Sequence, residues 1–163
     1  MFEKMLNNKN IEVKLNTDFQ KVKGKIKYDF MFYTGPIDEF FNFKFGKLKY
    51  RYLKIKFKTL NKKDYQPSAV VNYPELKYKF TRITEFKKLT QQNHNKTTIG
   101  IEYPGEEGFM AWPFLDEKNK KIFQRYWKET KRLKKKNIYF IGRLAEFRYC
   151  NMDEIVKEIL NSV

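Results

Sequence analysis

Hydrophobic and polar residues alternate along several short stretches in the first two thirds of the chain. Leu53, Ile55 and Phe57 alternate with lysines, which predicts a strand with one face on a core and one in water. Similar runs predict further strands at residues 11–15, 26–32, 69–73, 76–80 and 97–103. Because short connections separate most of these stretches, we expect the strands to pair antiparallel.

The spacing changes to a helical repeat in the last third of the chain. Asp116 is a suitable N-cap for a helix that begins at Glu117. This helix is expected to gather its larger apolar residues on one face: Ile122, Phe123, Tyr126, Trp127 and Leu133. Lysines at residues 134–136 suit the negative end of the helix dipole, and a solvated helix end explains them better than a nucleic-acid patch.

An apolar run at residues 138–141 predicts a buried strand that ends at Gly142 and Arg143. A final helix follows, with Asn151 as its cap and Glu154 placed to complete a capping box. Its apolar residues recur at helical spacing: Ile155, Val156, Ile159 and Leu160. The elements together predict an α+β fold.

Two residue counts limit the chemistry that the chain can perform. The single cysteine, Cys150, excludes an internal disulfide and a cysteine-rich zinc site. The single histidine, His94, lies in a polar run and is expected to be a solvated loop residue. No metal site and no Ser-His-Asp triad are therefore expected.

The chain has no apolar run of about 18 residues, so no membrane span is expected. Its first residues, Met-Phe-Glu-Lys-Met, contain no apolar signal core. The expected location is the cytoplasm.

The formal net charge is +16, which raises the question of a nucleic-acid partner. Only six of the 35 basic residues are arginine, the type that nucleic-acid readers favour. The lysines are dispersed over every predicted element, which fits the coding bias of an AT-rich genome better than a binding patch. Against this background each arginine is more informative than a lysine.

Several motifs follow one another along nearly the whole chain. They are Tyr33-Thr34-Gly35-Pro36-Ile37-Asp38-Glu39-Phe40-Phe41, Thr81-Arg82-Ile83-Thr84-Glu85, Glu102-Tyr103-Pro104, Gly142-Arg143-Leu144-Ala145-Glu146 and Tyr149-Cys150-Asn151-Met152-Asp153. In this order the chain resembles the UDP-galactopyranose mutases, flavoenzymes that interconvert UDP-galactopyranose and UDP-galactofuranose. Residues 2–6 also resemble an interior helix of that family.

The resemblance covers the C-terminal half, or slightly less, of that family. No Gly-rich loop for a dinucleotide pyrophosphate is found, because Gly105-Glu106-Glu107-Gly108 has the wrong context. The implied fold is therefore a fragment of an α/β FAD-binding flavoenzyme. It would have a mostly antiparallel sheet, plus a parallel-sheet strand and a C-terminal helix from an incomplete dinucleotide-binding domain.

The resemblance also implies three segments. Residues 1–46 would be part of the FAD-binding domain, and residues 47–115 an antiparallel substrate domain. Residues 116–163 would supply a helix, a strand and the C-terminal helix, returning to the FAD-binding domain.

In this family the reduced flavin is thought to attack the anomeric carbon of the sugar through N5 and to displace UDP. The positions that match substrate-binding residues are Arg82, Tyr149, Asn72, Glu102, Trp112 and Arg51. The positions that match cofactor-binding residues, for FAD in its reduced form, are Gly142, Arg143, Cys150, Asn151, Met152 and Asp153. No residue is singled out as catalytic.

These positions also have structural interpretations. Arg82 would hold the diphosphate, for which its planar charged fork is suited, or form a surface salt bridge. Arg143 would pair with cofactor phosphates or close a strand end. Asn72 and Glu102 would line the sugar pocket or end strands, and Arg51 would lie along the sheet.

Three positions depart from the family pattern. Asn151 stands where the family usually has aspartate, Trp112 where it has tyrosine, and Phe86 where histidine is common. These replacements suggest relaxed constraint on the site.

The leading hypothesis is that the chain is part of a UDP-galactopyranose mutase, an isomerase acting on a UDP-galactose nucleotide sugar. Activity would require a companion chain that carries the N-terminal half. The partner protein would be that separate chain or a homodimer partner. The alternatives are a catalytically inactive remnant and, less favoured, a basic module that binds nucleic acid.

Overall fold

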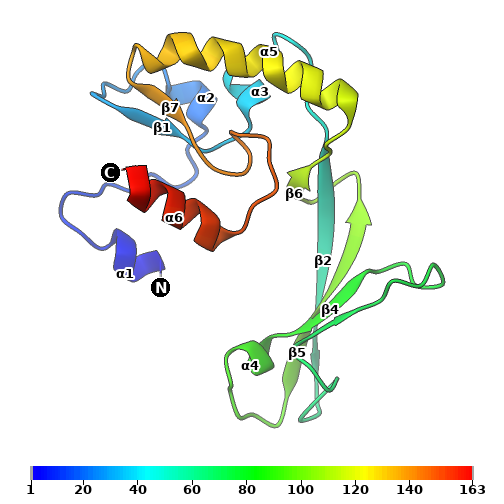
Figure 1. Cartoon of the computed structure of the whole chain (residues 1–163). Coiled ribbons are helices and arrows are strands. Elements are labelled where there is room, and N and C mark those ends of the chain that lie inside the picture. The colour runs from blue at the N-terminus through cyan, green and yellow to red at the C-terminus, as the bar shows by residue number, and fades with distance from the viewer. Residues whose placement is uncertain (1, 163) are drawn as a thin grey trace.

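The computed structural model describes residues 2–162 and divides them into two parts (Figure 1). Met1 and Val163, the outer ends of the first and third expected segments, lie outside the described residues. Residues 2–49 and 114–162 form a layered body, here called the lobe. Residues 50–113 form a sheet that projects from it, here called the sheet arm.

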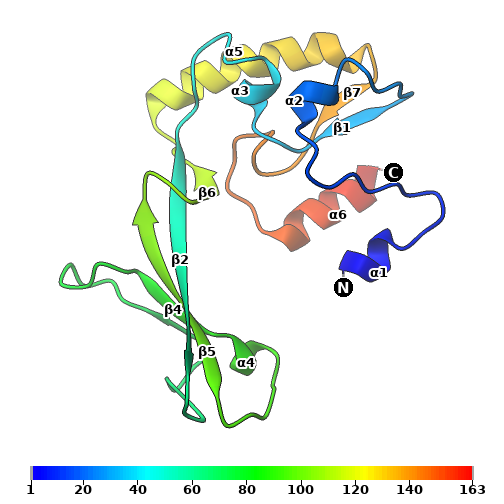
Figure 2. The same ribbon diagram turned by 180° about the vertical axis from the view of Figure 1, so that it is seen from behind.

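The lobe contains two paired strands and most of the helices. Its elements are α1 (Phe2–Leu6), α2 (Phe19–Val22), β1 (Met31–Tyr33), α3 (Ile37–Phe40), α5 (Glu117–Lys134), β7 (Ile138–Phe140) and α6 (Met152–Ser162). β1 and β7 pair in parallel, with Met31 opposite Ile138 and Tyr33 opposite Phe140. α5 lies on one side of this pair and α6 on the other, in both the front and back views (Figures 1 and 2).

Aromatic side chains fill the space between the β1–β7 pair and α5. Tyr126 of α5 is fully buried, and its ring stacks on Phe41 at 5.7 Å between centroids. Phe140 of β7 meets Phe40 edge to face at 4.8 Å. Such pairs add specific geometry to the burial of large apolar surfaces, so they fix how α3, α5 and β7 lie.

The sheet arm is a single antiparallel layer. Its elements are β2 (Tyr50–Leu60), β3 (Val70–Asn72), β4 (Arg82–Glu85), α4 (Phe86–Leu89), β5 (Thr97–Gly105) and β6 (Phe109–Pro113). The strand order is β3-β4-β5-β2-β6, so β2 lies between β5 and β6. The lysines that alternate along β2 are exposed, as predicted for a face in water. The prediction of a core on the other face is wrong at Phe57, which is largely exposed in this single layer.

Most elements predicted from the sequence are confirmed. The strand expected around Leu53 extends over the whole of β2, and the strands expected at 69–73, 97–103 and 138–141 are β3, β5 and β7. The strand expected at 26–32 is confirmed only at its end, as β1. The mixed fold, mostly antiparallel with one parallel pair, is also as predicted.

Both predicted helix starts are confirmed. Asp116 caps α5 through its carboxylate, which accepts a hydrogen bond from the Asn119 backbone N–H at 2.7 Å. At the start of α6, the Glu154 carboxylate accepts from the Asn151 N–H at 2.6 Å. Residues 2–6, which resemble a helix of the family, form the helix α1.

Two predicted strands are wrong. Residues 11–15 have no regular structure, and residues 76–80 form a turn region with Leu76 exposed. An alternating pattern forms a strand only where another strand supplies hydrogen-bond partners, and neither segment has one here. The strands β4 and β6 were missed, because both are short and carry weak alternation.

Among the described residues, no helix is both long and apolar enough to cross a membrane. The same part of the chain contains no group of three or more His, Cys, Asp or Glu side chains that could hold a metal ion.

Candidate functional site

Three of the expected substrate-binding residues form a row across the sheet arm. Asn72 lies opposite Arg82, and Arg82 lies opposite Glu102, on three neighbouring strands. Directly opposite residues in an antiparallel sheet point to the same face. The pairing of β3, β4 and β5 therefore brings these side chains together, although 30 positions separate the first from the last.

The side chains in this row contact one another. The Arg82 Nε donates to Asn72 Oδ1 at 3.0 Å, and Arg82 Nη1 lies 3.8 Å from Glu102 Oε2. Glu102 is mostly buried, whereas about half of the Arg82 side chain is exposed. A guanidinium has five N–H donors, so Arg82 keeps donors that can bind an anion such as a diphosphate.

A second group lies on the same face, closer to the lobe. Arg51 of β2 pairs with Trp112 of β6, and the Tyr149 ring meets the Trp112 ring at 6.3 Å and 81°. Together with residues 113–116 they line a hollow of about 420 Å³, here called the upper hollow. The Arg51 guanidinium lies over the Phe114 ring at 4.4 Å.

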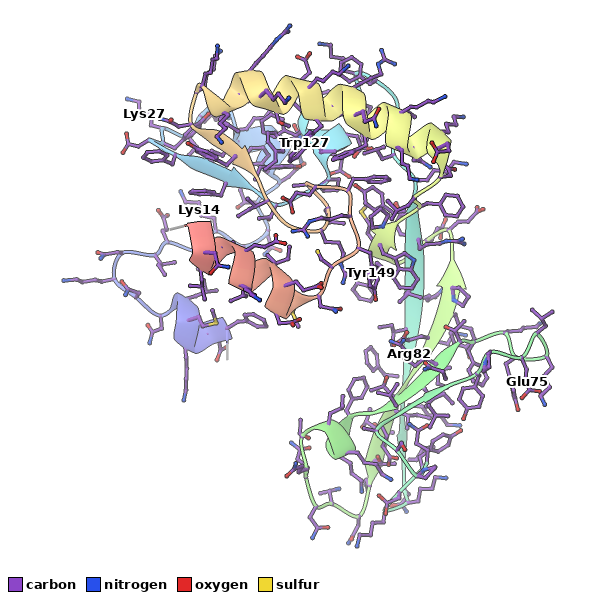
Figure 3. All side chains as sticks on the ribbon, viewed as in Figure 1. Lys14, Lys27, Glu75, Arg82, Trp127 and Tyr149 are labelled. Atoms are coloured by element: carbon purple, nitrogen blue, oxygen red, sulfur yellow. The ribbon has the colours of Figure 1, made fainter. Side chains whose placement is uncertain are left out.

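The row and the upper hollow lie at two positions along the same face of β2. Glu102 lies opposite Ile55, which points to the same face as Arg51 four residues earlier. At about 3.3 Å per residue, about 13 Å of strand separate the two positions. Figure 3 shows Arg82 and Tyr149 beside β2, with Tyr149 nearer the lobe. An elongated anionic ligand lying along β2 would therefore meet both groups.

The expected cofactor-binding residues gather where β7 ends and α6 begins. Gly142, Arg143 and Cys150 to Met152 line a hollow of about 620 Å³, here called the α6 hollow, and Asp153 follows in the first turn of α6. Thr34, at the end of β1, reaches the same hollow. Gly142 has a φ of +91°, a conformation that favours glycine.

The residues of the α6 hollow could hold part of a flavin. Apolar side chains such as Leu144 and Val156 line it, which suits one face of a planar ring. The start of a helix also offers backbone N–H groups. Asp153 and Glu154 place negative charge in that same turn, which disfavours phosphate groups there. The hollow therefore fits the ring end of FAD better than its pyrophosphate.

Glu85 is a buried residue at the end of the Thr81-Arg82-Ile83-Thr84-Glu85 motif, and the sequence did not predict a role for it. Its side chain is fully buried, and it accepts hydrogen bonds from Thr97 Oγ1 at 2.7 Å and from the Tyr65 N–H at 3.0 Å. Burial alone raises the pKa of the Glu85 carboxyl. The pKa is nevertheless held below its ordinary value by these two hydrogen bonds, by a third from the Gln66 N–H and by the charge of Lys88. Glu85 thus fixes the 61–69 loop against β4, the strand that carries Arg82.

Phe86 and His94 lie on the face of the sheet arm that carries Arg82, further from the lobe. The Phe86 ring packs over Gly100, where an added Cβ would come within 2.9 Å of the ring, and lies 5.8 Å from the Phe57 ring. His94 is exposed in a loop, as predicted, and its Nδ1 accepts from the Lys96 N–H at 3.0 Å.

These observations define a protein with a partly exposed arginine, Arg82, in a polar row on an antiparallel sheet and a partly apolar hollow at the start of α6. Comparison with known proteins identifies the group. The family model for UDP-galactopyranose mutase matches residues 1–149, and the chain belongs to this family. The last helix, α6, lies beyond the matched residues.

Individual relatives agree with this assignment. A UDP-galactopyranose mutase of Mycoplasma genitalium is 37% identical over 95% of this chain and 42% of the relative. A probable UDP-galactopyranose mutase of Klebsiella pneumoniae is 31% identical over 99% of this chain and 42% of the relative. A dTDP-fucopyranose mutase of Escherichia coli is 31% identical over 98% of this chain and 44% of the relative. The chain thus spans less than half the length of these curated relatives.

Proposed function

We propose that this chain forms the C-terminal, sugar-diphosphate-binding part of a UDP-galactopyranose mutase. With the rest of the fold present, the assembly would interconvert UDP-galactopyranose and UDP-galactofuranose in the cytoplasm. The observation that carries this proposal is the row of Asn72, Arg82 and Glu102 on the same sheet face as the upper hollow.

Each group has a distinct role in this proposal. Arg82 binds the diphosphate, because a permanent planar charge stabilises a departing diphosphate. Asn72 and Glu102 hold Arg82 in place and present oxygens to sugar hydroxyl groups. Tyr149, Trp112 and Arg51 enclose the other end of the ligand in the upper hollow.

Reduced FAD supplies the nucleophile for the anomeric carbon when it is bound. Among this chain's residues, Gly142 and the 150–153 segment would hold the ring end of the cofactor. The remaining groups of FAD would be bound by the part of the family fold that has no counterpart in this chain.

The lobe offers a surface for that remaining part. In the described residues β1 and β7 form a parallel sheet of two strands, and Phe30 and Phe32, at and beside β1, are largely exposed. Parallel sheets normally have both faces covered. Met152, Val156 and Leu160 leave a second apolar stripe exposed on α6. We infer that the rest of the mutase fold, in the same polypeptide or in a companion chain, adds strands here and covers these residues.

The test is to supply the family segment that precedes the matched region, taken from the Mycoplasma genitalium relative, both fused and as a separate chain. The expected result is a yellow complex that, once reduced, converts UDP-galactofuranose into UDP-galactopyranose. A yellow complex without turnover would identify an inactive remnant, consistent with the replacements Asn151, Trp112 and Phe86. The proposal would be contradicted by a colourless mixture, or by a homodimer of this chain that does not bind the added segment.

Replacing Arg82 tests the site itself. Arg82→Lys keeps the charge but loses the planar fork. The kcat/KM of the complex should therefore fall roughly 10- to 150-fold, which corresponds to a rise of about 1.5–3 kcal/mol in the activation free energy. Arg132→Lys is the matched control, because the Arg132 side chain is exposed on α5 and pairs with Glu129 of the same helix. Equal activity of the Arg82→Lys and control proteins would remove Arg82 from the proposal.

A further inference from the structure

The strand β6 contains an irregularity beside the upper hollow. Arg51 of β2 pairs with Trp112, but the next residue, Tyr52, pairs with Met110. Ala111 is therefore an extra residue in β6, which makes this a β-bulge. The extra residue of a bulge is left out of the ladder, so its backbone groups need other partners.

Arg143 supplies that partner from the lobe. Its Nη1 donates to the Ala111 carbonyl oxygen at 2.9 Å. Its Nε donates to the Cys150 carbonyl oxygen at 3.0 Å, and its Nη2 donates to the same oxygen. One guanidinium thus joins the bulge of the sheet arm to the turn that leads into α6.

The same guanidinium also touches the wall of the upper hollow. Its central carbon lies 5.0 Å from the centre of the Tyr149 ring, within the range of a cation–π contact. Tyr149 in turn meets Trp112, the neighbour of Ala111 in β6. A further hydrogen bond crosses the same junction, from the Tyr50 hydroxyl to the Leu144 carbonyl at 3.2 Å. It involves neither Tyr149 nor Trp112.

We propose that Arg143 is a positioning residue: by bridging the Ala111 bulge and the Tyr149–Cys150 turn, it fixes the Trp112–Tyr149 wall of the upper hollow. The role requires arginine, because a planar fork can bond two carbonyls in different directions while its face rests on a ring. Lysine carries the same charge but lacks this geometry. The importance of this wall for substrate rests on the proposed function, whereas the bridge itself does not.

The two tryptophans of the chain provide an internal comparison. Trp112 lies in the wall, while Trp127 lies in the lobe on α5, labelled in Figure 3. Labelling with 5-fluorotryptophan should give one ¹⁹F resonance for each, and Trp112→Phe assigns them. Arg143→Lys should shift or broaden the Trp112 resonance and leave that of Trp127 unchanged. Arg132→Lys should change neither.

Hydrogen exchange adds a second readout. Arg143→Lys should speed amide exchange in residues 109–113 by roughly 2- to 10-fold, the effect of losing about 0.5–1.5 kcal/mol of net hydrogen-bond stabilisation. Exchange in the aromatic core around Tyr126 should not change. If Arg143→Lys left the Trp112 resonance and this exchange unchanged, the bridge would be disproved. If it moved both tryptophan resonances together, Arg143 would be a general stability residue, and the proposal would fail.

A final comparison separates this inference from the proposed function. In an active complex, Arg143→Lys should raise KM for the sugar nucleotide more than it lowers kcat, because it loosens a binding wall. If the Trp112 resonance responds but the wild-type complex has no turnover, the bridge stands and the proposed function fails. If turnover is present and KM is unaffected, the wall does not position the substrate.

Discussion

The lobe and the sheet arm hold their shapes by different means. In the lobe, buried aromatic rings from α3, α5 and β7 contact one another directly. In the sheet arm, which is a single layer, backbone ladders and the buried Glu85 carboxylate add to smaller apolar contacts, such as those of Ile83 and Ile99. The lobe therefore depends mainly on shape and volume, whereas the arm depends more on hydrogen bonding.

This difference bears on where the proposed site lies. The row of Asn72, Arg82 and Glu102 is on the arm, whereas Tyr149 and the α6 hollow belong to the lobe. The geometry of the site thus requires both kinds of stabilisation, together with the contacts that join the two parts.

Removal of the Tyr126 side chain should have the largest effect. Tyr126→Ala leaves a cavity in the aromatic core, so the free energy of unfolding should fall by about 3–5 kcal/mol in urea titrations. Tyr126→Phe should cost about 1–2 kcal/mol, because the hydroxyl accepts from the Phe45 N–H at 2.9 Å and donates to the Gly46 carbonyl at 2.8 Å. Tyr28→Ala, at an exposed ring, is the control. A loss below about 1 kcal/mol for Tyr126→Ala would show that packing does not dominate the lobe.

Replacement of the buried carboxylate should have an intermediate effect. Glu85→Gln removes the charge that Thr97, Tyr65 and Gln66 stabilise, so unfolding at pH 7 should become easier by about 1–3 kcal/mol. The pKa of Glu85 is lowered below its ordinary value of 4.5 in the folded chain. Its contribution is therefore complete above pH 4.5 and is lost as the pH falls through the folded pKa.

The measurement is a pair of urea titrations of each protein, at pH 7 and pH 3. The difference between wild type and Glu85→Gln should be smaller at pH 3. Glu75→Gln is the control, because the Glu75 carboxylate is exposed and pairs with exposed Lys77. A difference that stays constant with pH would mean that the Glu85 charge does not stabilise the arm.

The smallest expected effect concerns the helix cap at the boundary of the two parts. Asp116→Ala removes the acceptor for the Asn119 N–H and should lower the free energy of unfolding by about 1 kcal/mol, measured as a lower Tm. Asp116→Asn should restore most of it, and Glu117→Gln, at an exposed position, should have little effect. The Asn119 side chain also accepts from the Lys49 N–H at 3.1 Å, next to the start of β2. If Asp116→Asn were as damaging as Asp116→Ala, the carboxylate charge rather than the cap would be responsible.

Prediction from sequence succeeded where local signals are strong. The Asp116 cap and the apolar face of α5 lie within one helix, so the sequence pattern contains all the required information. The alternation around Leu53 was long enough to predict β2. The motifs with Arg82 and Arg143 also led to the correct family, and their site roles remain predictions.

Prediction failed where a segment depends on distant partners. Residues 11–15 alternate well but have no neighbouring strand, whereas the short strand β4 forms because β3 and β5 flank it. Glu85 was noted only as part of a motif, because its donors Tyr65 and Thr97 come from separate loops and strands.

The sequence by itself determined the family, the helix α5 with its cap, the long strand β2 and the small set of arginines. Local periodicity, capping chemistry and motif order are properties of neighbouring residues. Only the tertiary structure decided that Asn72, Arg82 and Glu102 form one row, and that Arg143 reaches the bulge at Ala111. Strand register and the docking of the arm on the lobe fix those contacts, and both depend on hydrogen bonds between residues far apart in the chain.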